Sequence, residues 1–503
     1  MSNSLPQGWA SCTLADIAAV NPKTVADESL IAGFVPMSHA PTSYHGELLF
    51  DEKLWGEIKK SYTNFQDGDV IFAKVTPCFE NGKAAIVDDL PNGIGAGSSE
   101  FYVLRPHCGD ISQKLLFALI KTHTFMQEGA TNMTGAVGLR RVPKAFVETF
   151  PIALPPAEEQ KEIADRLDIL LAQVEATQAR LVRIPDIIKR FRQSVLTAAV
   201  SGKLTEEWRN GTESIDDPMP IVQTEKRMWI EKNPSHNEVN RVLKRVKEYK
   251  WGKTISEIEL PANWSWQQLE DSVLMIVDCH NKTAPYVESG IPLIRTSNIR
   301  DGEFVWQDLK FINQETYEYW SRRCPPEPGD IIFTREAPMG EAAIVPTGHR
   351  VCLGQRTMLI RPVENLVSAK YLLLAIMEPN FKKRSDIFAV GTGVKHYRVG
   401  DVSNLIIPIP PTEEQAEIVR RVEQLFAYAD RIEQQAKAAK ARVDNLTQAI
   451  LAKAFRGELT ADWRAANPDL ISGDNSAAAL LARIQAERAT AKPRKRATKT
   501  SAA

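Results

Sequence analysis

The sequence predicts an α+β protein with two mixed α/β domains in tandem duplication, separated by two long antiparallel coiled-coil helices. The first observation is that LPPAEEQKEIADRLD at 154–168 returns as IPPTEEQAEIVRRVE at 409–423, 255 positions later. The same offset joins LPQGW (5–9) to LPANW (260–264), and it joins 191–209 to 446–464. A fixed offset along most of the chain indicates an internal duplication.

Each of the two repeated stretches at 154 and 409 opens a long amphipathic helix. Its apolar residues step alternately by four and three, which keeps them on one helix face, as in a coiled-coil seam. Every seam position of the first helix matches one of the second at the same offset, and a single position is polar. The seam residues are Ile163, Leu167, Leu170, Val174, Thr177, Leu181, Ile184, Ile188, Phe191 and Val195, and then Ile418, Val422, Leu425, Ala429, Ile432, Ala436, Ala439, Val443, Leu446 and Ile450.

The simplest partner for each helix is the other copy. In full antiparallel register, Val174 would face Ala439 and Ile184 would face Ala429, so that large residues meet small ones. Such a pair would form a spacer of roughly 50 Å at about 1.5 Å per residue. Pro185 lies inside the first helix, where it should remove a hydrogen bond and kink the helix. Two unrelated surface helices would leave the common offset unexplained.

The composition of the chain is that of an ordinary soluble protein of several domains, with 503 residues, 43% hydrophobic and 25% charged. No apolar run is long enough to span a membrane and no basic-then-apolar leader is present, so we expect a cytoplasmic protein. The six cysteines form no CxxC pair, which predicts buried free thiols. The net charge is −1, so any nucleic-acid surface must be local or be completed by a partner.

Composition and repeats divide the chain into six segments. We expect a globular domain at 1–153, a long helix at 154–200, a charged linker with one helix at 201–258, a second globular domain at 259–409, a second long helix at 410–456, and a partly disordered C-terminal tail at 457–503. In the first globular domain, 69–73, 84–87 and 100–104 read as strands and 112–128 as helix. A short helix is expected at 477–488, before a basic C-terminal end.

The two globular domains share a plan but differ in their loops. GDVIFAKVTP (68–77) corresponds to GDIIFTREAP (329–338), and the offset drifts between 255 and 261 in these domains, whereas it is constant in the helices. Two domains on one scaffold that differ only in their loops are expected to contact different ligands.

No catalytic constellation is present in the sequence. It lacks a phosphate-binding GxxxxGK[ST] loop, HExxH, GxSxG, and GxGxxG after a strand. The NPP-aromatic motif of amino-methyltransferases is also missing, and the histidines form no ligand cluster. We therefore expect no catalytic residues and no metal site.

Two non-catalytic domains joined by a helical spacer suit recognition of two sites on a long ligand such as double-stranded DNA. Direct readout requires polar and basic side chains at base edges. Glycine-rich segments and sheet edges of both domains supply them. The candidate DNA-binding residues are Lys74, Lys83, Thr134, Arg140, Arg141, Lys144, Arg295, Thr296, Asn298, Arg335, Thr392, Lys395, His396, Tyr397 and Arg398.

The motifs together resemble one known family. LPxxW opens each domain, GD(V/I)IF precedes an AAIV strand, a TG segment is followed by basic residues, PPxEEQ opens each long helix and GxLTxxWR closes it. In this order and in duplicate, they resemble the specificity subunits of type I restriction-modification systems. The resemblance covers nearly the whole chain.

This resemblance implies a division of labour. The domains at 1–153 and 259–409 would be target-recognition domains, each reading half of a split DNA target, and the helices would set the spacer. Partners would be two modification subunits, which bind S-adenosylmethionine and methylate adenine N6, and two restriction subunits, which use ATP and Mg and cut DNA. This chain would bind no cofactor itself.

Two other functions remain open at this stage. A protein-only scaffold would use the two domains to dock protein partners without contacting DNA. An enzyme, either nuclease or methyltransferase, would carry unrecognised motifs. A steep fall of affinity with salt separates DNA binding from the scaffold, and activity of the isolated chain would establish the enzyme.

Overall fold

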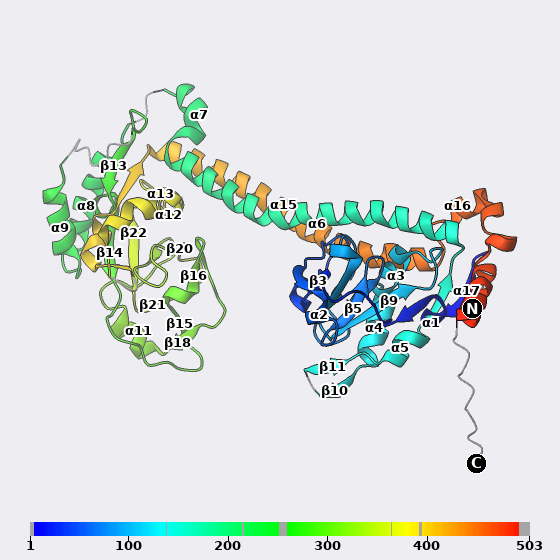
Figure 1. The fold of residues 1–503 in the computed structure, drawn as a ribbon. Coiled ribbons are helices and arrows are strands. Elements are labelled where there is room, and N and C mark those ends of the chain that lie inside the picture. The colour runs from blue at the N-terminus through cyan, green and yellow to red at the C-terminus, as the bar shows by residue number, and fades with distance from the viewer. Residues whose placement is uncertain are drawn as a thin grey trace, which may run out of the picture. The chain divides into compact units, whose positions relative to one another are not determined.

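The computed structural model describes residues 5–136, 138–213, 216–250, 259–363, 365–391 and 395–491. The chain forms two compact units, whose elements are labelled in Figure 1. Unit 1 comprises Met1–Val182 and Ala436–Ala503, and unit 2 comprises Arg183–Gln435. Each unit therefore contains part of both long helices, α6 (Ala157–Val200) and α15 (Thr412–Phe455).

Besides its share of the long helices, unit 1 contains a set of short elements. In chain order these are β1 (Ala10–Thr13), α1 (Leu14–Ile17), β2 (Ala18–Val20), β3 (Ile31–Val35), β4 (Asp51–Leu54), α2 (Trp55–Ile58), β5 (Thr63–Gln66), β6 (Val70–Ala73), β7 (Ala84–Ile86), β8 (Ile94–Gly97), β9 (Phe101–Pro106), α3 (Gln113–Ile120), α4 (His123–Thr131), β10 (Thr134–Ala136), β11 (Leu139–Arg141), α5 (Lys144–Thr149), β12 (Pro151–Leu154), α16 (Ala461–Ala466) and α17 (Ala477–Ala491).

Unit 2 repeats much of this plan. Its elements are α7 (Glu206–Asn210), α8 (Met219–Lys232), α9 (Val239–Glu248), β13 (Ser265–Gln268), α10 (Leu269–Ser272), β14 (Val273–Asp278), β15 (Ile291–Ile294), β16 (Ile299–Arg300), β17 (Glu303–Phe304), β18 (Lys310–Ile312), α11 (Gln314–Trp320), β19 (Ile331–Thr334), β20 (Ala342–Ile344), β21 (Cys352–Leu353), β22 (Thr357–Pro362), α12 (Ala369–Met377), α13 (Pro379–Ser385), β23 (Ala389–Val390), β24 (His396–Tyr397), α14 (Val399–Ser403) and β25 (Ile406–Ile409).

A four-stranded antiparallel sheet lies at the centre of each unit, in the order β2-β9-β6-β7 in unit 1 and β14-β22-β19-β20 in unit 2. Its central strands are buried on both faces. Val70 and Phe72 of β6 enter one apolar cluster, while Ile71, between them, enters another on the opposite face. In β19, Ile331 and the adjacent Ile332 likewise enter two different apolar clusters on opposite faces. Successive side chains of a strand alternate faces, so an unbroken apolar run predicts a strand covered on both sides.

A second sheet in each unit contains one parallel pair. In unit 1 its order is β4-β3-β8-β5, with β3 parallel to β8, and in unit 2 its order is β18-β15-β21, with β15 parallel to β21. The strands expected at 69–73, 84–87 and 100–104 are confirmed as β6, β7 and β9. The expected helix at 112–128 is two helices: α3 ends at Ile120, and Thr122 caps α4 by accepting a hydrogen bond from the Phe125 amide.

The coiled-coil seam is confirmed in both long helices. Of its ten positions in each helix, Thr177 and Leu446 are exposed and the rest are buried or half-buried. Ile163 and Leu167 pack with Leu451 in unit 1. Helix α6 continues through Pro185 without a break.

The helices run antiparallel within each unit, but not in the full register. That register would place Gln178 opposite Gln435, whereas the Gln178 amide donates to Asp444 at 3.2 Å. It would likewise place Arg192 opposite Arg421, whereas Arg192 pairs with Asp430. In both units the partner lies further along α15. A seam with a regular repeat allows such shifts, because displacing one helix along the other still brings apolar residues together.

The repeated motifs meet in two matching hydrogen-bond networks. In unit 1 the buried Glu159 carboxylate accepts from the Trp9 indole at 2.8 Å, from the Thr460 hydroxyl at 2.7 Å and from Arg464 at 3.0 Å. The three donors come from two different motifs. LPxxW provides the tryptophan, and GxLTxxWR of the other repeat provides the threonine and arginine.

Unit 2 contains the same network at the same offset. The Glu414 carboxylate accepts from the Trp264 indole at 2.8 Å, from the Thr205 hydroxyl at 2.7 Å and from Arg209 at 2.7 Å. In each unit, the end of one repeat therefore closes the start of the other.

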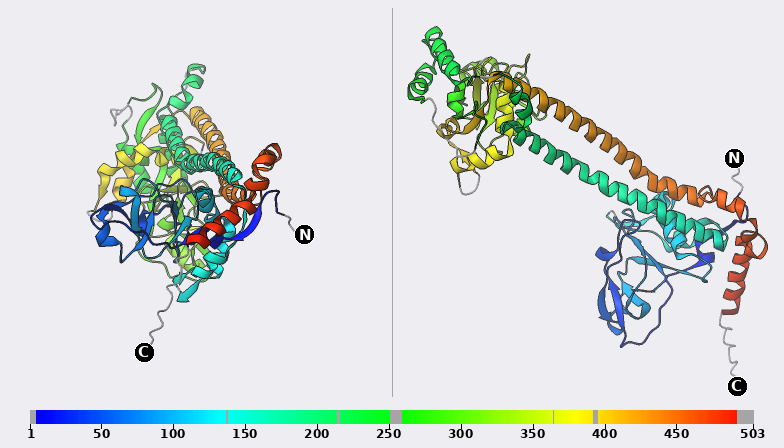
Figure 2. Two further views of the ribbon diagram at one scale, coloured as in Figure 1. Left: turned by 45° about the vertical axis from the view of Figure 1, so that its right-hand side comes forward. Right: turned by 90° about the horizontal axis from the view of Figure 1, so that it is seen from above.

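The segments expected as linker and tail are built into the cores. Met219 and Val222 of α8 are buried in the main cluster of unit 2, and Val242 of α9 is buried in a neighbouring cluster. Leu480 and Ile484 of α17 are buried in the core of unit 1. Figures 1 and 2 show the red helix α17 beside the blue N-terminal elements. The disorder predicted for residues 492–503 lies outside the described residues.

No helix in the described part of the chain has the length and apolarity needed to cross a membrane. The six cysteines are free thiols, as predicted; Cys279, Cys324 and Cys352 are buried and the other three are half-buried. Burial raises the pKa of Cys324 and of Cys352 to about 11.

Candidate nucleic-acid interface

The glycine-rich segment of unit 1 forms a two-stranded hairpin. β10 pairs antiparallel with β11, and the positive φ of Gly135 within β10 (+123°) and of Gly138 at the turn (+83°) suits glycine. The hairpin is attached to the segment after β6, because the Thr76 amide donates to the Arg140 carbonyl at 3.0 Å. Thr134 is exposed, while Arg140 and Arg141 are half-buried. These three candidates therefore lie on one protruding element.

Most cations of this surface in unit 1 already have an acidic partner. Arg141 binds the Glu100 carboxylate with both Nε and Nη2, at 2.9 and 2.7 Å. This pairing lowers the pKa of Glu100 and raises that of Arg141. Arg140 lies 3.6 Å from Glu80. These pairings reduce the net positive charge of the surface.

The three candidate lysines of unit 1 lie in different environments. Lys74 donates to the Ser99 carbonyl at 2.8 Å, and Lys83 donates to the Met37 carbonyl at 2.7 Å. Lys144 starts α5 and pairs with Glu148, one turn later, at 2.8 Å. Lys74 is the one nearest the hairpin, since its carbonyl accepts from the Val142 amide at 2.8 Å.

In unit 2 the corresponding hairpin consists of β23 and β24. Lys395 is exposed and its amine lies 3.5 Å from the Asp386 carboxylate. His396 is half-buried and Arg398 is exposed. Thr392 lies outside the described residues.

Tyr397 is a core residue, unlike its neighbours. It is fully buried, its ring stacks on Phe333 with centroids 5.9 Å apart, and its hydroxyl lies 2.6 Å from the Ser385 hydroxyl. Burial raises its pKa. Its location suits support of the hairpin rather than contact with a ligand.

The sheet-edge candidates of unit 2 have distinct structural roles. Asn298 is buried and builds a turn, because its amide donates to the Val305 carbonyl at 3.2 Å and its oxygen accepts from the Arg295 amide at 3.3 Å. Thr296 begins that turn, a 3₁₀ helix at Thr296–Asn298. Arg335 donates to the Tyr397 carbonyl at 3.1 Å and so attaches the hairpin to the end of β19.

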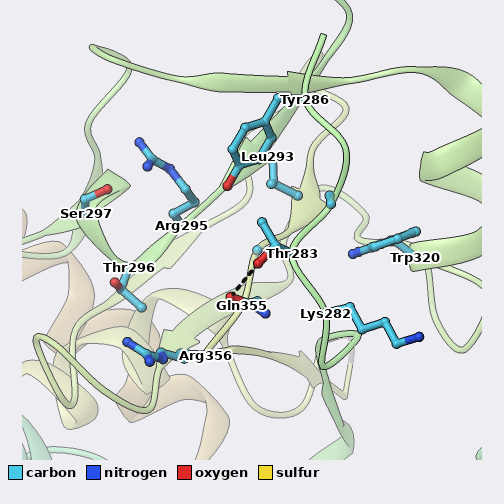
Figure 3. Close-up of a pocket in the computed structure, with 12 residues that line it drawn as sticks. Lys282, Thr283, Tyr286, Leu293, Arg295, Thr296, Ser297, Trp320, Gln355 and Arg356 are labelled. Carbon is cyan, nitrogen blue, oxygen red and sulfur yellow. Dashed lines mark hydrogen bonds between the residues drawn. The ribbon is translucent and has the colours of Figure 1, made fainter.

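A cleft of about 250 Å³ opens beside these residues in unit 2. Figure 3 shows Arg295, Thr296 and Arg356 on one side of the segment that carries Thr283, and Lys282 with Trp320 on the other. None of the lining residues is acidic. They are Lys282, Thr283, Ala284, Tyr286, Leu293, Arg295, Thr296, Ser297, Trp320, Gly354, Gln355 and Arg356.

The cleft joins sequence-predicted residues to others that the sequence did not single out. Arg295 and Thr296 were expected at a DNA surface, whereas Lys282, Gln355 and Arg356 were not. The available signal for the last two was the turn GQR at 354–356, directly before β22, where Arg356 has a φ of +67°. Positive φ in a residue other than glycine is uncommon and often marks a functional site.

Among the described residues, no group of three or more His, Cys, Asp or Glu side chains is arranged to hold a metal ion. What the candidate surfaces offer is a set of guanidinium, ammonium, hydroxyl and amide donors on hairpins and turns. Such donors can bind phosphate oxygens and base edges.

Comparison with known proteins adds independent information. The sequence model of the type I restriction modification DNA specificity domain matches residues 6–185 and 279–440. The specificity subunit of the type I restriction enzyme EcoBI from Escherichia coli is 39% identical over 361 residues, which cover 71% of this chain and 68% of that protein. The EcoKI specificity subunit of Escherichia coli strain K12 is 33% identical over 99% of this chain and 100% of its own length.

A solved structure has a similar fold. The crystal structure of the HsdS subunit from Thermoanaerobacter tengcongensis matches 91% of this chain and 99% of its own with a TM-score of 0.58, at 21% sequence identity. The predicted fold class, two mixed α/β units in tandem with two long helices, is thereby confirmed. Because the family model matches both units and these relatives share a third or more of their residues over most of the chain, the chain belongs to the type I restriction-modification DNA specificity subunit family.

Proposed function

We propose that this chain is the sequence-specificity subunit of a type I restriction-modification enzyme. It reads a bipartite DNA target and directs adenine methylation and DNA cleavage by partner subunits. The observation that carries this proposal is the match of the DNA specificity domain to both halves of a duplicated chain, at 6–185 and 279–440. Two recognition modules in one chain are what a target in two halves requires.

Each unit supplies one recognition domain in this proposal. The domains at 1–153 and 259–409 read one half-site each, and the helices at 154–200 and 410–456 set the distance between the half-sites. Exposed residues on or beside the hairpins, such as Thr134, Lys395 and Arg398, together with the half-buried Arg140, support base or phosphate contact, because they are polar or basic. Buried Asn298 and Tyr397 act by holding those surfaces in shape.

The chemistry belongs to the partners in this proposal. Two modification subunits bind S-adenosylmethionine and methylate adenine N6, and two restriction subunits use ATP and Mg to translocate and cut DNA. The chain itself binds no cofactor and carries no catalytic residue. Its lack of the common catalytic sequence motifs supports this division.

Single-molecule sequencing of methylated adenine tests the proposal. DNA is taken from cells that express this chain with its modification subunit. The expected result is a new split motif with one methylated adenine per half. An assembled complex that adds no methylation would contradict the proposal. Affinity for the DNA of that motif should fall steeply with salt, as phosphate contacts require, whereas a protein-only scaffold would show no such dependence.

A further inference from the structure

The two units carry opposite charge at one structurally equivalent place. Equivalence follows from matching backbone hydrogen bonds. The Arg335 amide donates to the Arg356 carbonyl at 2.8 Å in unit 2, as the Lys74 amide donates to the Glu100 carbonyl at 2.9 Å in unit 1. Arg356 therefore occupies the position of Glu100.

A second pair of bonds aligns the other wall of the cleft. The Gly354 amide donates to the Ile294 carbonyl at 2.8 Å in unit 2, as the Ser98 amide donates to the Val35 carbonyl at 3.0 Å in unit 1. The residue that follows the acceptor is Arg295 in unit 2 and Pro36 in unit 1, so these two residues occupy equivalent positions. Two arginines in unit 2 thus correspond to a proline and a glutamate in unit 1.

The arginines of the cleft retain donors for a ligand. Arg295 donates through Nη2 to the Asp308 carbonyl at 3.0 Å, but its Nε is buried and has no hydrogen-bond partner in the part of the chain that the structure describes. Arg356 meets the Glu336 carboxylate through Nε at 3.1 Å, with about half of its side chain exposed. Figure 3 shows Arg356 below Thr296, and Ser297 beside the Arg295 guanidinium, along the same side of the cleft.

We propose that this cleft of unit 2 binds a phosphodiester group of the DNA backbone, clamped between Arg295 and Arg356, and that unit 1 lacks such a clamp. The inference rests on the proposed function and deepens it. Two guanidinium groups with neighbouring hydroxyls and no lining carboxylate match the charge and the acceptor-rich surface of a phosphate. In unit 1 the corresponding residues are Pro36, which carries no charge, and Glu100, whose carboxylate is bound by Arg141, so neither can donate to a phosphate.

The proposed clamp predicts that Arg295 and Arg356 of unit 2 contribute measurably to the salt dependence of DNA binding. The complex of the full chain with its modification subunits is titrated with DNA that contains its target, at several salt concentrations. Each phosphate contact contributes about 0.9 to the slope of log affinity against log salt. Arg295→Ala and Arg356→Ala are each expected to reduce that slope by about one and to weaken binding about tenfold, since a hydrogen bond to a charged group is lost. The methylated motif should stay the same.

Three matched variants make the test specific. Arg295→Lys keeps the positive charge and is expected to keep the slope, so that a fall in affinity of Arg295→Ala cannot be assigned to a disturbed turn. Arg431→Ala removes an exposed cation of α15 outside the cleft and should leave the slope unchanged. Pro36→Arg introduces a cation at the corresponding place in unit 1, where the second arginine of the clamp is missing, so no gain in slope is expected.

Several outcomes would overturn the clamp. One is a complex that binds and methylates its target while Arg295→Ala and Arg356→Ala keep the wild-type slope; the proposed function would then stand without it. A relaxed motif in Arg295→Lys would assign the residue to guanine readout instead, because lysine cannot reproduce the arginine fork. Inorganic phosphate that binds the full chain and is lost in the double alanine variant, with DNA slopes unchanged, would indicate a free anion site. Absence of any methylation by the wild-type complex would contradict the proposed function itself.

Discussion

Glu159 and Glu414 are fully buried carboxylates, and each is surrounded by three donors from two separate motifs. A buried charge is tolerated when it is paired and its remaining lone pairs are satisfied. Tryptophan, threonine and arginine together provide these bonds to each carboxylate. This explains at the level of single side chains why LPxxW, PPxEEQ and GxLTxxWR occur together: each motif contributes one part of the same contact.

Removing one carboxylate should therefore be strongly destabilising. Glu414→Ala would leave Arg209 and the Trp264 indole without their shared acceptor in a buried place. We expect a loss of about 3–5 kcal/mol in the free energy of unfolding of unit 2. Urea unfolding followed by tryptophan fluorescence measures it. The neighbouring Glu413→Ala is the matched control, because Glu413 is exposed and its removal should change stability by less than about 1 kcal/mol. Equal effects of the two substitutions would contradict the role of the network.

Lys226 gives unit 2 a pH dependence. Its amine is buried in α8 and donates to the Glu270 and Asp271 carbonyls at 2.6 and 2.9 Å. Burial lowers its pKa to about 7, against the smaller opposing effect of the Asp271 and Glu270 carboxylates. The unfolded chain keeps an ordinary lysine pKa of about 10.4 and so retains a proton that the folded chain has released.

Between about pH 7 and pH 10 the unfolded state therefore binds more protons, and stability of unit 2 rises with pH by up to about 1.4 kcal/mol per unit. Lys226→Met replaces the titrating amine with an apolar side chain of similar length and should abolish this rise. Urea unfolding of both proteins at pH 7, 8 and 9 gives the comparison. Parallel pH profiles for wild type and variant would exclude Lys226 as the origin.

At the scale of elements, the long helices show which features a sequence predicts well. The seam and the start of each helix follow from local spacing, and both are present as expected. The register could not be predicted, because a regular seam accepts more than one alignment and the choice depends on side-chain pairs such as Gln178 with Asp444. Helices α8 and α17 lie in segments expected as a linker and a tail, because the burial of Val222 and Leu480 depends on packing against distant parts of the chain, which a local pattern does not show.

The candidate recognition surfaces also show what local sequence pattern can and cannot predict. Thr134, Arg140 and Lys395 were found from composition, and they do lie on hairpins. Tyr397 has the same kind of neighbours in sequence but is buried, because its ring fills the space beside Phe333. Arg356 was missed, since its relation to Arg295 exists only when β15 and β21 lie side by side. Local pattern identifies an exposed segment, while convergence of distant residues requires the folded chain.

Shortening both helices tests their role as a spacer. Glu175 accepts hydrogen bonds from the Tyr44 amide at 2.8 Å and from the His45 amide at 3.3 Å, so the deletion should lie beyond it. Removing residues 179–182 and their repeat equivalents 434–437 takes about 6 Å from each helix, or roughly two base pairs of DNA. Methylated-adenine sequencing should show the two half-sites unchanged and the spacer altered. An unaltered spacer in an active complex would contradict the assignment.

At the scale of the whole molecule, each unit is closed by chain from both repeats. Unit 1 begins at the N-terminus, yet its core contains Ala477, Leu480 and Ile484 of α17. The Ala477 amide donates to the Gly8 carbonyl at 2.9 Å, which joins the two ends of the described chain directly. The stability of unit 1 is therefore expected to depend on residues that follow every element of unit 2.

Truncation after Ser472 tests this dependence. Loss of α17 uncovers apolar side chains of the unit 1 core, each worth about 2–5 kcal/mol when a buried leucine or isoleucine is removed. Hydrogen exchange should show faster exchange in β6 and β9 and unchanged protection in β19 and β22. Truncation after Ala491 serves as the control, because it retains every core residue of α17. Equal loss of protection in both units would indicate a general effect on folding instead.

The twin networks around Glu159 and Glu414 also bear on how new targets can arise. Each globular domain is joined to the end of the other repeat through the same four types of side chain, so a foreign domain bounded by LPxxW and PPxEEQ would meet the bonding partners that its predecessor left. Recombination at these repeated motifs could then exchange one half of the target as a block. The long helices would keep the contacts that they make with each other.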